Sequence, residues 1–349
     1  MITGTAGVSP LRLVRPAHDP RRHLLLDNGW SAVGRDLVSP PALFRLRVRG
    51  EAGEVVGVAA RFLVADPPAG SGLLPHERTD ERAVRRRVRA LRSAHVDRDP
   101  LLLTHRGRGV VPDLVDASAV PLWRHTESGH DVEVEQVAGD RVDAVLAALG
   151  AARLLVADGH HRLAASVALA AQGVTTHVTG LVVDADRTPF RLGPVHRVLL
   201  DEDGREQLPG DALDTLLGRC RRAGGVVGRG SAPHEGAVQV VHGEVEWHVT
   251  WPGHPAGDVT SLVEHVLDDA ERTRTRREPS AVAATTAARH GAVAVLLPPP
   301  SLDAVLETAE RGALLPYKAT AFEPKLPSGV LVRPLPAWYA EHGWHEATG

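Results

Sequence analysis

The sequence contains very little cysteine, and it has no long apolar run. Cys220 is the only cysteine among the 349 residues, so an intrachain disulfide is excluded and a reducing compartment is expected. No run of 18 apolar residues occurs and the N-terminus lacks the apolar stretch of a signal peptide, so we expect a cytoplasmic protein without a membrane partner. The net charge of -3 predicts no binding to nucleic acid, because a general positive footprint is missing.

Several common catalytic motifs are also absent. The sequence has no Gly-x-x-x-x-Gly-Lys-Ser/Thr loop, no Gly-x-Gly-x-x-Gly fingerprint, no Gly-x-Ser-x-Gly elbow and no His-Glu-x-x-His pair. Each of these carries the chemistry of one large class: P-loop NTPases, Rossmann dehydrogenases, α/β-hydrolases and zinc peptidases. Those four interpretations therefore lose their main support.

Lysine is almost absent, and the two lysines lie close together. Of 40 basic residues only Lys318 and Lys325 are lysine, and both belong to segment 316–325. Lysine differs from arginine as a compact charge on a flexible stem, which suits contact with a single phosphate or carboxylate oxygen. The segment is therefore a candidate binding element, although chance clustering on a solvated loop is the alternative.

The most informative stretch that is present is 158–162, with the sequence Asp-Gly-His-His-Arg. A short apolar run precedes it and a helical apolar pattern follows it, which predicts a strand-turn-helix corner with Asp158 as the N-cap. His160, His161 and Arg162 would then occupy the first helical turn, where cations are unfavourable. An anion bound at this turn would reverse that effect, and phosphate is a common ligand of helix N-termini. Solvent-exposed histidines on a capped corner are the alternative.

Periodicity and turn residues predict an α+β protein with a boundary near 201–204. A helix is expected after Thr79 as its cap, with an arginine-rich face that is typical of a solvated surface. The other predicted elements are strands at 54–65, 131–137, 153–157, 177–183 and 292–297, a hairpin of 237–241 and 244–251, and helices at 141–149, from 158, and near 211, 260, 280 and 301.

Four segments together resemble one family. Residues 75–79 (Pro-His-Glu-Arg-Thr), 158–162, 195–197 (Val-His-Arg) and 316–325 are similar, in the same order, to the motifs of a widespread family that resembles the free serine kinases of the ParB and sulfiredoxin superfamily. This resemblance implies a ParB/sulfiredoxin-like nucleotide-binding core in residues 1–200 and a second α+β lobe in 201–349, which returns the lysine-bearing segment to the site. The family's usual N-terminal Ala-Pro-Pro-Tyr-Asp-Val segment is not recognisable here.

The resemblance also implies roles for individual residues. Glu77 is the candidate catalytic base, and Asp158 is a magnesium or hydroxyl-orienting group, with His160 as a further catalytic residue. The implied contacts with the nucleotide phosphates are Gly159, His161, Arg162, His196, Arg197, Lys318, Thr320 and Lys325. The implied contacts with the acceptor are His76 and Thr79. Without the resemblance, a structural role for Glu77 at the start of the following helix is about equally expected.

These residues predict a nucleotide-dependent phosphotransferase that uses ATP or ADP with Mg²⁺ and acts on a small hydroxy amino acid, in first place free L-serine. Phosphoryl transfer mainly requires positioning and charge stabilisation, and the residue types are suitable. One alternative is a ParB-like regulator that binds nucleotide without turnover. Another is a metal site on His160, His161 and His196, which is disfavoured because adjacent helical histidines point apart.

Overall fold

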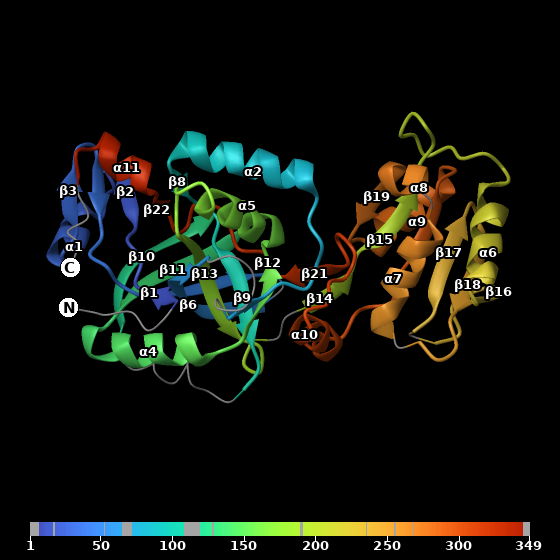
Figure 1. The fold of residues 1–349 in the computed structure, drawn as a ribbon, viewed down its shortest axis with the longest axis horizontal. Helices are drawn as coiled ribbons and strands as arrows, with labels where there is room; N and C mark the ends of the chain where they lie inside the picture. The colour runs from blue at the N-terminus through green and yellow to red at the C-terminus, as the bar shows by residue number, and fades with distance from the viewer. Residues whose placement is uncertain are drawn as a thin grey trace. The chain divides into compact units, whose positions relative to one another are not determined.

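The computed structural model describes residues 7–16, 18–51, 53–64, 72–107, 119–127, 129–188, 191–234, 236–254, 256–267 and 269–344. The chain forms two compact units (Figure 1). Unit 1 consists of Met1–Pro75, Thr79–Phe190 and Pro324–Gly349, and unit 2 consists of His76–Arg78 and Arg191–Glu323. The predicted boundary at 201–204 lies within unit 2, and the division into domains 1–200 and 201–349 stays a prediction.

Unit 1 is built on a mixed β-sheet with the strand order β10-β11-β5-β6-β13-β9-β12-β7, and β1 pairs with β6. The strands are β1 (Val8–Ser9), β5 (Phe44–Gly50), β6 (Gly53–Leu63), β7 (Leu73–Leu74), β9 (Leu101–His105), β10 (Ala119–Glu127), β11 (His130–Val137), β12 (Leu154–Asp158) and β13 (His177–Asp184). The sequence-based strands in this unit are confirmed. Their alternating or continuous apolar residues are buried, as the patterns predict.

Helices and short strands complete unit 1. They are α1 (Arg22–Asp27), α2 (Glu81–Ala94), α4 (Gly139–Ala151), α5 (His160–Ala170), α11 (Pro336–Glu341), β2 (Val14–Pro16), β3 (Ser31–Val33), β4 (Asp36–Val38), β8 (Val96–Asp97) and β22 (Arg333–Pro334). Apolar residues of α4 and α5 pack into the main core of this unit, and α2 lies against α5 (Figure 1). The arginine-rich face of α2 is exposed, which confirms the predicted solvated surface.

Unit 2 contains a second sheet with the order β16-β18-β17-β20-β15-β19, and a separate pair of β14 with β21. Its elements are β14 (Arg191–Pro194), β15 (His196–Leu199), α6 (Ala212–Arg222), β16 (Val226–Arg229), β17 (Val238–His242), β18 (Val245–Thr250), α7 (Ala256–Val266), α8 (Asp269–Arg274), β19 (Thr275–Glu278), α9 (Ala281–Arg289), β20 (Val293–Leu296), α10 (Leu302–Glu310) and β21 (Thr320–Glu323). The predicted hairpin is confirmed as β17 and β18. Ser280 and Ser301 cap α9 and α10, as their sequence positions predict.

Three predicted helix starts are wrong. Asp80, not Thr79, caps α2, because its side chain accepts a hydrogen bond from the Ala83 N–H at 2.7 Å. Asp158 ends β12 and Gly159 is the N-cap of α5. The Asp158 carboxylate is bonded to two cationic side chains, which explains why it does not cap the helix. Helix α7 starts at Ala256, before the position near 260 that periodicity predicts.

Within the described residues, no helix is both long enough and apolar enough to cross a bilayer.

Candidate functional site

The Asp-Gly-His-His-Arg segment forms a tight corner between β12 and α5 in unit 1. Gly159 has φ 108°, a left-handed conformation that favours glycine. A Cβ atom at this position would lie 2.7 Å from Leu101 Cδ2 and 2.9 Å from Arg162 Nε. The corner therefore depends on glycine for both its backbone angle and its close packing, and the predicted placement of three cationic residue types in the first turn of a helix is confirmed.

The carboxylate of Asp158 bonds to two cationic side chains at this corner. Arg162 Nη2 donates to Asp158 Oδ2, and Arg162 Nη1 donates to the Pro100 carbonyl. Lys325 Nζ lies 2.8 Å from Asp158 Oδ1. Two cations thus share one carboxylate, which leaves one excess positive charge in this group of three. The anion expected from the sequence is, in this structure, at least partly supplied by Asp158 itself.

The two histidines of the corner have different surroundings. His160 is buried with 7% of its surface exposed. His161 Nε2 accepts a hydrogen bond from the Asp80 N–H at 3.0 Å. An imidazole nitrogen that accepts a hydrogen bond carries no proton, so this contact requires the tautomer with hydrogen on Nδ1. His161 therefore links the start of α5 to the start of α2, and its predicted phosphate contact stays a prediction.

In unit 2, His76, Glu77 and Thr320 form a buried polar relay. Glu77 Oε1 accepts from the Thr320 N–H at 2.8 Å and from the Thr320 hydroxyl. His76 Nε2 lies 2.9 Å from the same hydroxyl oxygen, and because that hydroxyl donates to Glu77, we assign His76 Nε2 as the donor. All three side chains are buried. These hydrogen bonds fix the orientation of the Glu77 carboxylate. A suitable geometry is the first condition for a general base, before a suitable pKa.

A second buried group in unit 2 surrounds Arg197. Its Nε donates to Glu264 Oε1 at 2.5 Å, and Arg277 Nη2 lies 3.8 Å from the same oxygen. Burial lowers the pKa of Arg197, an effect that Glu264 opposes and Arg277 adds to. The neighbouring His196 is buried, and its Nδ1 accepts from the Leu297 N–H at 3.0 Å. Burial, followed by the adjacent Arg197, lowers the pKa of His196, an effect that Glu278 opposes.

The predicted site residues therefore divide between the units. Thr79, segment 158–162 and Lys325 belong to unit 1, and His76, Glu77, His196, Arg197, Lys318 and Thr320 belong to unit 2. Thr79 and Lys318 are exposed. Among the charged residues that the structure describes around these positions, sequence reasoning did not single out Asp80, Glu264 or Arg277. Asp80 carried a usable signal as an acidic residue at a helix start, but nothing local distinguishes Glu264 or Arg277 from other charged residues on a helix or strand.

The residues present do not fit the predicted magnesium site. Both Asp158 oxygens are bonded to cationic side chains, so a divalent cation would have to displace at least one of them. Among the residues that the structure describes, no group of three or more His, Cys, Asp or Glu side chains is arranged to hold a metal ion. The alternative metal site on His160, His161 and His196 gains no support, because His196 Nδ1 accepts the Leu297 N–H and is not available as a ligand. Burial raises the pKa of the Cys220 thiol to about 11, which makes it a poor nucleophile.

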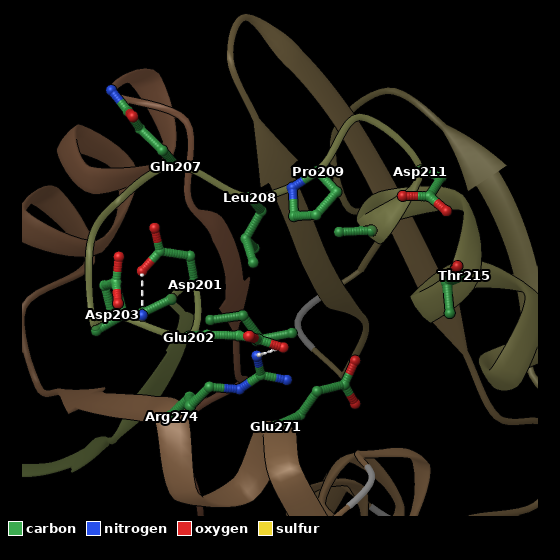
Figure 2. Close-up of a pocket in the computed structure, with 13 residues that line it drawn as sticks. Asp201, Glu202, Asp203, Gln207, Leu208, Pro209, Asp211, Thr215, Glu271 and Arg274 are labelled. Carbon is green, nitrogen blue, oxygen red and sulfur yellow. Dashed lines mark hydrogen bonds and ion pairs between the residues drawn. The ribbon is translucent and has the colours of Figure 1, made fainter.

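Unit 2 also contains an open pocket of about 590 Å³ that includes none of the predicted site residues (Figure 2). Its charged lining residues are Asp201, Glu202, Asp203, Asp211, Glu271 and Arg274. In Figure 2 the Arg274 guanidinium points toward Glu202, at 3.7 Å. One arginine against five carboxylates makes this wall repulsive to phosphate groups, so we do not assign the nucleotide to this pocket.

Comparison with solved structures finds several similar chains. The chain is similar to a free serine kinase mutant in complex with AMP, with 16% identity and a TM-score of 0.47 over 75% of this chain and 89% of the other. It is also similar to SbnI with a C-terminal truncation from Staphylococcus aureus, with 15% identity and a TM-score of 0.47 over 75% and 84%. A conserved hypothetical protein from Pyrococcus furiosus has 14% identity and a TM-score of 0.46 over 75% and 92%.

A search of curated proteins finds no match. The family model described as "Protein of unknown function (DUF1015)" matches residues 39–249, which is more than half of the 349 residues. That stretch contains three of the four motif segments, namely 75–79, 158–162 and 195–197. The chain therefore belongs to the DUF1015 family.

Proposed function

We propose that this protein is a nucleotide-dependent phosphotransferase that phosphorylates the hydroxyl group of a small amino acid, in first place free L-serine, giving O-phosphoserine. The observation that carries the proposal is that motif residues far apart in the sequence meet within each unit. Glu77 contacts Thr320 across 243 positions, and Asp158 contacts Lys325 across 167 positions. Separate motif segments thus supply polar and charged side chains to the same local cluster within each unit, as a binding or catalytic site requires.

The corner in unit 1 supplies the groups that phosphoryl transfer requires for binding a nucleotide. Backbone N–H groups at the start of α5 face outward from the helix end, and Arg162 and Lys325 provide two cationic donors for phosphate oxygens. An incoming phosphate group competes with the Asp158 carboxylate for these donors. We therefore assign phosphate binding to Gly159, Arg162 and Lys325, with Asp158 as an internal substitute for the phosphate when no nucleotide is bound.

The relay in unit 2 supplies the base. The Thr320 hydroxyl donates to Glu77 Oε1, which is the same type of contact that a substrate hydroxyl makes with a general base. In the proposed step Glu77 takes the proton from the serine hydroxyl, and the oxygen attacks the terminal phosphorus of ATP or ADP. The P–O bond to the leaving ADP or AMP then breaks. The assignments of His76, Thr79, His160, His161, His196, Arg197 and Lys318 to substrate or nucleotide stay predictions.

The proposal is tested by incubating the purified protein with ATP or ADP, with and without magnesium, and with a panel of hydroxy amino acids. We expect mass spectrometry to detect a phosphorylated amino acid, with L-serine as the preferred acceptor. The absence of phosphate transfer to every member of the panel, with both nucleotides, would overturn the proposal.

A second candidate, a regulator that binds nucleotide without turnover, is favoured by one observation. Asp158 is occupied by Arg162 and Lys325, and a kinase ordinarily needs a carboxylate that is available for the metal ion. A regulator predicts tight nucleotide binding and no phosphorylated product in the wild type. Product formation by the wild type that is lost in Glu77→Gln excludes it.

A further inference from the structure

Two arginines lie directly opposite each other on neighbouring strands of unit 2. Arg197 of β15 pairs with Arg277 of β19 in the antiparallel register, so their side chains share one face of the sheet. Like charges at directly opposed positions destabilise a sheet, and Arg197 is completely buried, with 0% of its surface exposed. A sequence that keeps such a pair needs compensating acceptors on that face.

The compensation inside the chain is incomplete. Glu264 shares one carboxylate oxygen between the two guanidinium groups, and Arg197 Nη1 donates to the Val195 carbonyl. Arg197 Nη2 is buried, and among the residues that the structure describes it has no hydrogen-bond partner. The carboxylate of Glu77 acts on Arg197 through space. Buried guanidinium donors are normally satisfied, so Nη2 indicates an acceptor other than the residues described around it.

The partner arginine is held in a fixed position. Arg277 Nε donates to the Tyr317 carbonyl at 3.2 Å, and its guanidinium lies 4.8 Å from the centre of the Tyr317 ring. The next residue, Lys318, has φ 55°, a left-handed conformation that is unfavourable for a non-glycine residue. Backbone strain of this kind is concentrated at binding and catalytic sites. Segment 317–318 therefore supports Arg277 in the orientation that completes the arginine pair.

We propose that Arg197 Nη2 and Arg277 bind the carboxylate group of the acceptor amino acid. This inference rests on the proposed function and adds to it the residues that recognise the α-carboxylate beside the reacting hydroxyl. A carboxylate is planar and matches the two parallel donors of a guanidinium group. In a small hydroxy amino acid the carboxylate and the hydroxyl are on adjacent carbons, which agrees with an arginine whose charge Glu77 already influences.

The test measures equilibrium binding by calorimetry in the absence of nucleotide, so that it does not depend on turnover. The probes are L-serine, ethanolamine, which is serine without its carboxylate, and inorganic phosphate as a competitor. Arg277→Gln removes one arm of the pair. Arg276→Gln is the matched control, because Arg276 is the adjacent residue on the opposite face of β19 and pairs with Glu206 at 2.8 Å.

We expect L-serine to bind the wild type and Arg276→Gln equally, and Arg277→Gln at least about tenfold more weakly. Ethanolamine binding should be weak and equal in all three proteins. Equal binding of serine and ethanolamine by the wild type, or no serine binding, would overturn the subsite and leave an internal water at Nη2. If inorganic phosphate binds the wild type more tightly than L-serine does and displaces L-serine, the carboxylate subsite is also overturned, in favour of a phosphate site. The wild-type comparisons remain decisive even where Arg277→Gln does not fold.

The outcomes for the subsite and for the proposed function are separate. Carboxylate-dependent binding without any phosphate transfer would contradict the proposed function and support the subsite. Phosphate transfer to L-serine together with carboxylate-independent binding would support the proposed function and contradict the subsite.

Discussion

The Asp158 corner of unit 1 and the buried polar groups of unit 2 hold their motif residues in opposite ways. In unit 1 the Asp158 side chain is 31% exposed and Lys325 is 53% exposed, whereas in unit 2 His76 and Arg197 are both 0% exposed. Partly exposed ion pairs contribute little stability and exchange readily, but buried polar networks are rigid and sensitive to the loss of one member. Under the proposed function, the cations of unit 1 would exchange Asp158 for a phosphate group, and the buried network of unit 2 would hold the Glu77 carboxylate in a fixed orientation.

The largest expected effect is on turnover in unit 2. Glu77→Gln keeps the size of the side chain but removes the proton acceptor, so we expect the rate of phosphate transfer to fall by about 10²- to 10⁴-fold. Nucleotide affinity, measured by calorimetry, should not change, because the proposed phosphate donors lie in unit 1. The matched control is Glu323→Gln, because Glu323 is an exposed glutamate of β21, the strand that also contains Thr320. Full activity in Glu77→Gln would remove Glu77 from the chemistry.

The next effect concerns the stability of the relay. Thr320→Val deletes the hydroxyl that lies between His76 and Glu77, and we expect the free energy of unfolding to fall by about 1–3 kcal/mol because buried polar groups lose a partner. Urea denaturation measures this change. Thr285→Val is the control, since its hydroxyl bonds to the Ala281 carbonyl on an exposed helix surface, and we expect less than about 0.5 kcal/mol. An equal decrease in the free energy of unfolding for the two variants would mean that the buried Thr320 hydroxyl contributes no more to stability than an exposed one.

In unit 1 the expected effect is smaller and has the opposite sign. Asp158→Asn removes the carboxylate that competes with phosphate for Arg162 and Lys325, so we expect nucleotide affinity without metal to increase by about two- to fivefold, the range given by partly exposed ion pairs. Lys325→Gln should weaken binding, and Asp143→Asn on the exposed side of α4 should have no effect. Weaker binding by Asp158→Asn would instead make Asp158 a direct ligand of the nucleotide or its metal.

A separate expected effect is the pH dependence of stability. Burial, with Arg61 and Arg333 nearby, lowers the pKa of His177 in unit 1 from 6.5 to about 4. As the pH falls through this interval the unfolded chain takes up a proton before the folded chain does, so the free energy of unfolding decreases. We expect His177→Gln to reduce this decrease, and His196→Gln to do the same for unit 2, where burial also lowers the histidine pKa. Urea denaturation above pH 6.5 and near pH 4 measures the free energy of unfolding of both variants. If each variant loses as much stability between these pH values as the wild type does, the lowered histidine pKa values are contradicted.

The local elements of both units could be predicted from the sequence because they depend on short-range patterns. The strand before residue 158, the helix after it and the serine-capped helices are examples. The contacts that define the site depend on tertiary pairing. No pattern around Asp158 indicates that it bonds to Lys325 instead of capping α5, and none indicates that Glu264 bridges Arg197 and Arg277. Periodicity describes one element at a time, and these contacts join several.

The most direct measurement is a ³¹P NMR time course of the wild-type protein with free L-serine and either ATP or ADP. If Glu77 and the Asp158 corner serve phosphate transfer, a phosphomonoester resonance of O-phosphoserine appears while the terminal phosphate signal of one nucleotide declines. Complete retention of both nucleotides, with no phosphomonoester from serine or any other hydroxy amino acid, would contradict a phosphotransferase.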